Sequence, residues 1–218
     1  MPAGPPPAQP TRTRIKVCGI RTADAALAAT DAGADAIGFL FVTSSPRFIE
    51  PEDAAAIMLG LPPFTATVGV FMNASANAFT DIEEACPTSH TQLHGSEDED
   101  LVSQCGPAIK AVRYARDTIE RDLARWDRCN DVEAILIDGP APGQGVPFEW
   151  SDLAPFVRGL AKPVFLAGGL TPDNVAAAIR VVRPYAVDVS SGVESSRGVK
   201  DAALIRAFCD AVRAADRG

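Results

Sequence analysis

Two side chains capable of acid–base chemistry end two apolar runs that lie far apart in the chain. Cys18 ends the run Arg14–Cys18, and Asp138 ends the run Ala134–Asp138. A thiol near a positive charge can act as a base at neutral pH, and a partly shielded carboxyl group can act as a general acid. If both runs are strands of one barrel, the two side chains lie on the same rim and form a candidate base and acid for one reaction.

Both residues also fit a purely structural interpretation. Cys18 has the features of a buried thiol, and Asp138 has those of a residue that caps the Gly- and Pro-rich segment 139–145. Strand alternation places Lys16 on the same inward face as Cys18, about 7 Å away at roughly 3.3 Å per residue. The sequence leaves open whether Lys16 lowers the pKa of Cys18 or pairs with Asp188.

Small residues follow the last two apolar runs and form the best binding signal. Backbone N–H groups in such clusters can approach an anion closely, and barrels usually hold phosphate in the loops after strands seven and eight. We therefore expect phosphate binding by Gly168, Gly169, Ser190, Ser191 and Gly192.

Three further polar residues are expected to bind substrate on the same rim. Arg47 follows Pro46 and can hold a carboxylate or phosphate with two hydrogen bonds, unless it is a solvated surface arginine. His94 has no partner at ligand spacing, so it suits a hydrogen bond, to a ligand or within the protein, better than a metal. Asp188 completes this group, and no metal site is expected.

These residues must be positioned by elements that repeat along the chain. Eight short apolar runs alternate with longer Ala-rich, charged segments, which is typical of strand–helix units around a parallel sheet. The predicted strands are Arg14–Cys18, Ala36–Phe41, Ala66–Phe71, His90–Leu93, Ile109–Val112, Ala134–Asp138, Val164–Ala167 and Ala186–Ser190. Helices are predicted over segments such as Thr22–Ala32, closed by Gly33, and Thr171–Val182, with Thr171 as the N-cap.

The predicted fold class is α/β, a single-domain (β/α)8 barrel. A doubly wound open sheet is the alternative. That fold normally has fewer strands and a nucleotide-type glycine fingerprint after the first strand, which the segment 19–21 lacks.

Composition narrows the class of protein. The length of 218 residues allows one large domain, and the net charge of −8 argues against a general affinity for nucleic acid. Five scattered cysteines without a Cys-x-x-Cys pair suit a reducing cytosol, and no apolar run approaches the roughly 18 residues of a membrane helix. We expect a disordered Pro-rich tail over 1–12 rather than a signal peptide, a catalytic barrel over 13–218, a cytoplasmic location, and a monomer or homodimer.

Taken in order, several stretches resemble one family, phosphoribosylanthranilate isomerase. The likeness runs from Arg14 to the C-terminal helix, and the number and order of the matches make it specific. The stretches are Lys16–Ile20, Gly33–Phe39, Ser45–Arg47, Val68–Phe71, Gln92–Gly95, Gly168–Leu170 with Pro172 and Asn174, and Asp188–Glu194 with Gly198, Lys200 and Asp201.

The resemblance implies a barrel enzyme of tryptophan biosynthesis. Its reaction is the Amadori rearrangement of N-(5-phosphoribosyl)anthranilate to 1-(2-carboxyphenylamino)-1-deoxyribulose 5-phosphate, and no cofactor is expected. The family's roles imply that Asp138 protonates the furanose ring oxygen, that Cys18 takes the proton from sugar C2, and that Arg47 holds the anthranilate carboxylate. The Gly and Ser clusters match the family's phosphate site.

Two alternative functions remain, and one loop departs from the family. A histidine-pathway isomerase performs the same chemistry with aspartate at both catalytic positions, so Cys18 counts against it, and a non-catalytic phosphometabolite-binding barrel needs no acid and base. The loop over 143–145, before Phe148 and Trp150, is shorter than the family's usual one. We expect the difference to affect that loop's closure and ligand contacts rather than the activity.

Overall fold

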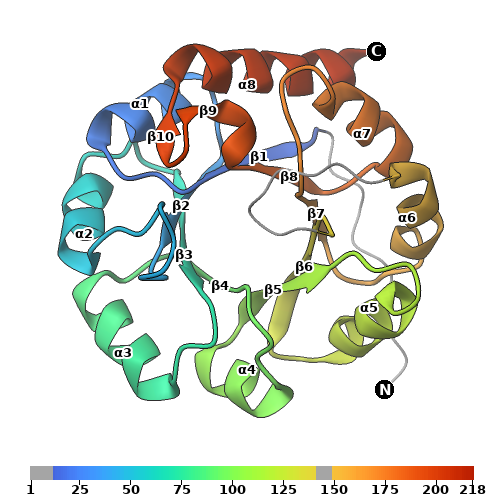
Figure 1. Cartoon of the computed structure of the whole chain (residues 1–218), viewed down its shortest axis with the longest axis horizontal. Helices are drawn as coiled ribbons and strands as arrows, with labels where there is room; N and C mark the ends of the chain where they lie inside the picture. The colour runs from blue at the N-terminus through green and yellow to red at the C-terminus, as the bar shows by residue number, and fades with distance from the viewer. Residues whose placement is uncertain (1–11, 141–148) are drawn as a thin grey trace.

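Eight parallel strands close into a barrel in the computed structural model, which describes residues 12–140 and 149–218 (Figure 1). Each strand pairs with the next along the chain, and β8 pairs with β1. The strands are β1 Arg14–Cys18, β2 Ala36–Leu40, β3 Ala66–Phe71, β4 His90–Leu93, β5 Ala108–Arg113, β6 Val132–Asp138, β7 Val164–Leu166 and β8 Ala186–Val189. The closed order confirms the (β/α)8 prediction and excludes the open sheet.

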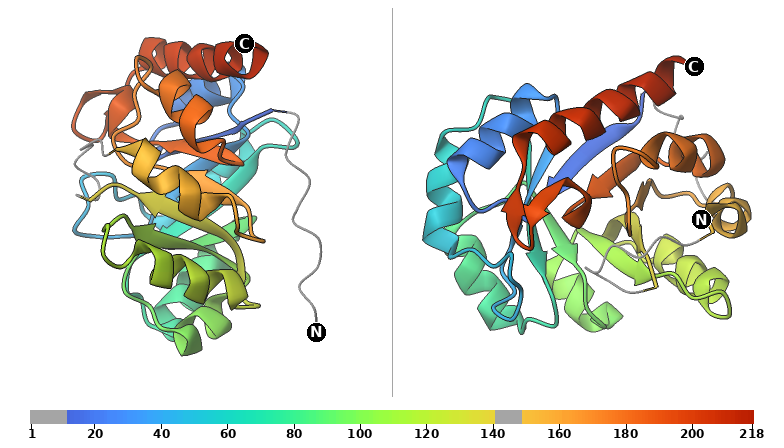
Figure 2. Two further views of the ribbon diagram at one scale, coloured as in Figure 1. Left: turned by 90° about the vertical axis from the view of Figure 1, so that its right-hand side faces the viewer. Right: turned by 45° about the horizontal axis from the view of Figure 1, so that its top comes forward.

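Helices alternate with the strands and cover the outside of the barrel as a ring (Figure 1). They are α1 Ala23–Asp31, α2 Pro51–Leu59, α3 Ala76–Ala85, α4 Glu99–Cys105, α5 Ile119–Arg128, α6 Trp150–Val157, α7 Val175–Val182 and α8 Ala202–Arg217. After β8 come a short 3-10 helix, η1 Ser191–Val193, and a hairpin of β9 Glu194–Ser196 and β10 Val199–Lys200. The left view of Figure 2 shows this hairpin on the same side of the barrel as the loop after β2.

Strand alternation divides the core into two layers. Outward-facing residues such as Ile15, Val17 and Ile137 pack against the helices, whereas Cys18 and Leu136 belong to a smaller cluster inside the barrel. Because neighbouring residues of a strand point to opposite faces, the residues that end β1 and β6 point inward at the carboxyl end. The strand ends therefore put Cys18 and Asp138 on one rim, and alternation points both side chains inward.

The predicted strands agree with the observed ones to within two residues at each end. Gly33 closes α1 with a φ of +88°, as predicted. The predicted start of the helix at Thr171 is wrong, because α7 begins at Val175 with Asn174 as its N-cap residue. The Asn174 carboxamide accepts a hydrogen bond from the Thr171 N–H at 2.8 Å, so residues 171–174 form a turn instead of the first helical turn.

Two predictions fall on segments outside the described residues. The tail prediction covers 1–12, of which only Arg12 is described, where it pairs with Asp35. The short loop at 143–145 lies entirely outside them. Over the ranges that are described, no helix is long and apolar enough to cross a membrane.

Candidate active site

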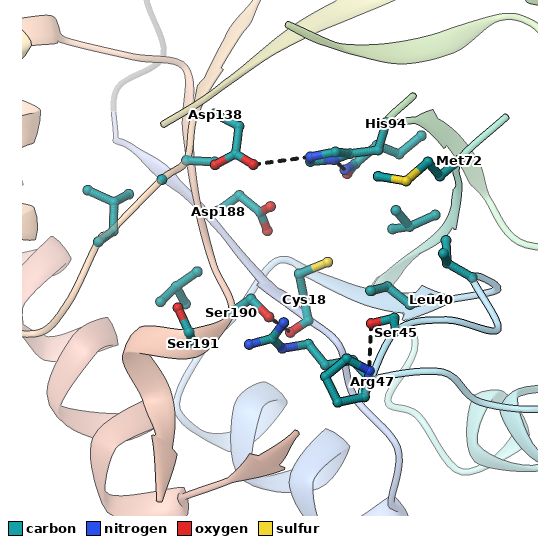
Figure 3. A pocket seen from close by; sticks show the side chains of 18 of the residues that line it. Cys18, Leu40, Ser45, Arg47, Met72, His94, Asp138, Asp188, Ser190 and Ser191 are labelled. Atoms are coloured by element: carbon teal, nitrogen blue, oxygen red, sulfur yellow. Dashed lines mark hydrogen bonds and ion pairs between the residues drawn. The ribbon is translucent and has the colours of Figure 1, made fainter. Parts of the chain in front are cut away.

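The carboxyl ends of the strands surround a cavity of about 310 Å³ (Figure 3). Nine of the ten residues predicted to form the site line it: Cys18, Arg47, His94, Asp138, Gly168, Gly169, Asp188, Ser190 and Ser191. Gly192 is not part of the lining. A Cβ added to Gly192 would lie 1.9 Å from the Leu170 carbonyl oxygen, so the loops after β7 and β8 meet there backbone to backbone.

Asp138 ends β6 with both carboxylate oxygens engaged. Its Oδ1 accepts a hydrogen bond from the Gly139 N–H at 2.8 Å, and its Oδ2 lies 3.1 Å from His94 Nε2 (Figure 3). The contact with Gly139 is the turn cap that the sequence analysis gave as the structural alternative for Asp138. The contact with His94 joins Asp138 to a side chain that can carry a proton. Asp138 is 7% exposed, so its carboxyl group lies at the cavity wall, partly shielded from water.

Gln92 fixes the orientation of His94, although the sequence analysis gave Gln92 no role. Gln92 Nε2 lies 2.8 Å from His94 Nδ1. With the amide nitrogen as donor, Nδ1 accepts, and the Nε2–H of His94 donates to Asp138. Gln92 is buried, and its Oε1 has no hydrogen-bond partner among the described residues, so it is an acceptor that a ligand hydroxyl can satisfy.

Cys18 ends β1 beside a buried ion pair. Lys16 Nζ lies 2.9 Å from Asp188 Oδ1, and Lys16 is 1% exposed. A Cβ added to Gly38 would lie 2.9 Å from Cys18 Sγ and 3.2 Å from Lys16 Nζ, so the absence of a side chain at Gly38 leaves room for both groups. Lys16 thus pairs with Asp188 and also faces Cys18, which combines the two arrangements that the sequence left open.

The electrostatic balance at Cys18 favours the thiol in the free protein. Burial raises the pKa of Cys18, and the ammonium groups of Lys16 and Lys200 oppose this effect only in part. For Lys16, burial works in the other direction, but the carboxylate of Asp188 more than compensates, so the pKa of Lys16 is raised and its charge is kept. Cys18 is therefore neutral near pH 7, next to a fixed positive charge.

Arg47 is buried, so the surface-arginine interpretation is wrong. Its Nε and Nη2 donate to Glu194 Oε1 and Oε2 at 2.7 and 3.0 Å, and Lys200 Nζ lies 2.9 Å from Glu194 Oε1. Burial opposes the charge on Glu194, but the hydrogen bonds from Arg47 and Lys200 lower its pKa to about 2. The three charges sum to +1, which leaves this side of the cavity attractive to an anion.

The glycine-rich loop after β7 packs its backbone against Gly139, the residue that follows β6. Gly168 has a φ of +80°, and a Cβ there would lie 2.1 Å from the Gly139 nitrogen. Asn174 Nδ2 donates to the Gly169 carbonyl at 2.8 Å and holds the loop in place. The Ser190 hydroxyl donates to the Cys18 carbonyl at 3.0 Å, which ties the predicted phosphate loop to the end of β1.

The sequence analysis missed four residues of the site: Gln92, Glu194, Arg197 and Lys200. A polar residue two positions before His94 in an apolar strand was a usable signal for Gln92, because alternation points both inward. The other three follow β8 in a segment that the sequence analysis used only as part of a family match. Within the described ranges, no group of three His, Cys, Asp or Glu side chains is placed to hold a metal ion.

Comparison with known proteins shows which family the chain resembles. Residues 15–211 match the family model described as N-(5'-phosphoribosyl)anthranilate isomerase. A relative of that name from Pseudomonas fluorescens (strain Pf0-1) is 49% identical over 92% of this chain and 98% of its own.

Two solved structures share the fold over 93% of this chain and 99% of theirs. One is a phosphoribosyl anthranilate isomerase in complex with reduced 1-(o-carboxyphenylamino)-1-deoxyribulose 5-phosphate, with 38% identity and a TM-score of 0.82. The other contains monomers generated from the dimeric phosphoribosylanthranilate isomerase of Thermotoga maritima, with 37% identity and a TM-score of 0.80.

Proposed function

The chain belongs to the family of N-(5'-phosphoribosyl)anthranilate isomerases, and from that premise we propose that Asp138 is the acid and Cys18 the base of its reaction. The family's reaction in tryptophan biosynthesis converts N-(5-phosphoribosyl)anthranilate to the corresponding 1-deoxyribulose 5-phosphate. The assignment rests on one observation: Cys18 and the His94–Asp138 pair line the same cavity, with Cys18 at the end of β1 and Asp138 at the end of β6.

Ring opening is the first step, and it needs a proton on the furanose oxygen. Asp138 delivers that proton as the bond from C1 to the ring oxygen breaks, and the nitrogen lone pair forms the Schiff base. Hydrogen bonds to both oxygens of Asp138 fix the direction of the carboxyl group. His94 and Gln92 thereby act as positioning residues for the acid.

Proton transfer from C2 is the second step. The Cys18 thiolate takes the C2 proton, the electrons of the C–H bond form the enolamine, and tautomerisation gives the ketone. Lys16 supports this step because its buried ammonium group favours the anionic form of the neighbouring sulfur.

The two anionic ends of the substrate match two different parts of the cavity wall. The loops after β7 and β8, with Gly168, Gly169, Ser190, Ser191 and Gly192, are proposed to hold the phosphate. Arg47 is proposed to hold the anthranilate carboxylate through the donors that Glu194 leaves unused. Asp188, which lines the same cavity and anchors Lys16, is proposed to bind the substrate.

Kinetics of matched variants test these roles. Asp138→Asn and Cys18→Ala are each expected to lower kcat by at least about a hundredfold, the usual scale for general acid–base groups. The assay is the loss of substrate fluorescence, with thermal unfolding as a check that each variant is folded. Cys129→Ala removes a thiol at the end of α5, outside the cavity, and is expected to retain full activity.

The outcomes separate the alternatives. Full activity of either variant would refute the role of that residue. No turnover by the folded wild-type protein would instead favour a non-catalytic barrel that binds a phosphorylated metabolite.

A homodimer in a reducing cytosol is part of the proposal. Leu59, at the end of α2, and Phe64, just before β3, are 91% and 104% exposed, which the sequence analysis did not anticipate. The Thermotoga maritima relative is described as dimeric. Five unpaired thiols support the reducing compartment. A molar mass of one chain by light scattering would refute the dimer.

A further inference from the structure

We call the part of the cavity next to Arg47, Glu194 and Lys200 the carboxylate side. It has a further cation, to which no role has been assigned. Arg197 lines the cavity, is exposed, and makes no ion pair or hydrogen bond with any residue of the described ranges. Arg197 lies in the turn between β9 and β10, directly after Ser196, the last residue of β9. An unpaired arginine that faces a cavity is available to bind an anionic group of a ligand.

The turn that carries Arg197 has a defined position. Gly198 has a φ of +83°, and a Cβ there would lie 2.6 Å from the Pro46 carbonyl oxygen, so the turn packs against the loop that carries Arg47. The Gly198 N–H also donates to Glu194 Oε2 at 3.1 Å. The same carboxylate therefore holds Arg47 and the turn next to Arg197.

Arg47 alone is a weakened anion receptor because Glu194 takes two of its donors. The pair is bidentate and buried, with side chains 7% and 4% exposed. A substrate carboxylate placed at Arg47 also approaches the carboxylate of Glu194, and like charges at short range repel. Lys200 also offsets the charge of Glu194, but its side chain is 2% exposed and does not line the cavity. Arg197 does line the cavity, and among the described residues it has no partner that takes its donors.

We propose that Arg197 binds the anthranilate carboxylate together with Arg47 and so contributes to the preference for an aryl group with a carboxylate next to the nitrogen. This inference rests on the proposed function of the site. Arg197 is proposed as a binding residue and not as a catalytic one, because no bond forms or breaks at the anthranilate carboxylate.

The test compares Arg197→Met and Arg197→Lys with Arg206→Met, which removes an exposed arginine from α8, outside the cavity. Arg197→Met is expected to raise KM about tenfold with kcat nearly unchanged, which is the scale of one hydrogen bond to a charged group. Arg197→Lys keeps the charge and is expected to give an intermediate KM, and Arg206→Met the wild-type KM.

Competition with fragments of the substrate identifies which end Arg197 contacts. In Arg197→Met, the inhibition constant of anthranilate is expected to rise in parallel with KM, whereas that of inorganic phosphate stays unchanged, and aniline binds equally weakly to variant and wild type. An unchanged KM, or a rise confined to phosphate, would overturn the proposal. Failure of the proposed function is distinguishable, because it would appear as no turnover by the wild-type protein, or as turnover that persists in Cys18→Ala or Asp138→Asn, whatever Arg197 does.

Discussion

The Cys18 thiol has to lose its proton before it can accept one from C2, and burial opposes that loss. The pKa of Cys18 lies above its ordinary value because burial outweighs the opposing charges of Lys16 and Lys200. A raised pKa means that the thiolate fraction of the free protein grows as the pH rises through the alkaline range. We therefore expect kcat/KM, which reports on the free enzyme, to rise with pH above neutrality.

Thiolate absorbance in the ultraviolet measures the same ionisation directly. The difference between the titration curves of wild type and Cys18→Ala isolates Cys18 from the other thiols, of which Cys86 and Cys209 have pKa values raised to about 11 by burial. The midpoint of the difference curve is expected above the ordinary pKa of cysteine and to coincide with the rise in kcat/KM. A midpoint below neutrality would show that the electrostatic argument is wrong.

At the scale of elements, the loop after β4 determines where His94 lies. Glu97 accepts hydrogen bonds from the Gly95 N–H and from the Asn73 N–H, so it ties this loop to the one after β3. Lys110 Nζ, on β5, lies 2.9 Å from Glu97 Oε2 and also donates to the Gly95 carbonyl. Both side chains of this pair are almost fully buried.

Removing one charge of that buried pair is expected to be costly. Glu97→Gln leaves Lys110 buried without its anionic partner, so the free energy of unfolding is expected to fall by about 3–5 kcal/mol, with a lower kcat as His94 shifts. Urea unfolding and steady-state kinetics measure the two effects. Glu99→Gln, which loses the exposed contact with Arg125, is the matched control and is expected to cost less than about 1 kcal/mol.

The double variant decides whether the charge is the cause. Glu97→Gln with Lys110→Met removes both charges and is expected to recover part of the stability that Glu97→Gln loses. A double variant less stable than Glu97→Gln would show that Lys110 stabilises the fold by contacts other than its pair with Glu97.

The elements were largely predictable because their signals are local. The ends of two predicted strands were enough to place Cys18 and Asp138 on one rim, and Gly33 marked the end of α1. The start of α7 was not predictable from cap preferences, because Thr171 and Asn174 are both acceptable caps and only the contact between Asn174 and the Gly169 carbonyl selects one.

For the whole molecule, the closure of the barrel creates contacts that no local pattern contains. Arg47 and Glu194 are 147 positions apart in the chain and meet because β8 returns to β1. A partner at that separation is chosen by the topology and not by spacing, so the sequence predicted an arginine that binds an anion without predicting the carboxylate that holds it. Lys200 reaches Glu194 locally instead, because β10 pairs Lys200 with Glu194 in one hairpin, and together with Arg47 the two side chains set the charge of the carboxylate side.

This long-range pair also predicts how the fold responds to acid. The folded pKa of Glu194 is about 2, against about 4.3 for an unfolded glutamate, so its ionisation contributes about 3 kcal/mol that is fully present above the unfolded pKa. Protonation removes the contribution as the pH falls from about 4.5 towards 2. The lowered pKa values of Glu97 and Asp35 act in the same direction, whereas His90, whose pKa is raised by its hydrogen bond to Glu133, loses its contribution as the pH rises.

Unfolding measured as a function of pH tests the prediction. Wild-type stability is expected to fall steeply below about pH 4.5. Glu194→Gln is expected to be less stable at neutral pH and to show a shallower fall, since it has no carboxylate at this position to protonate. Glu84→Gln removes an exposed carboxylate of α3 and is expected to follow the wild-type curve. Parallel acid limbs for Glu194→Gln and wild type would mean that the ionisation of Glu194 does not stabilise the folded barrel, and that the Arg47–Glu194–Lys200 contact adds nothing to its closure.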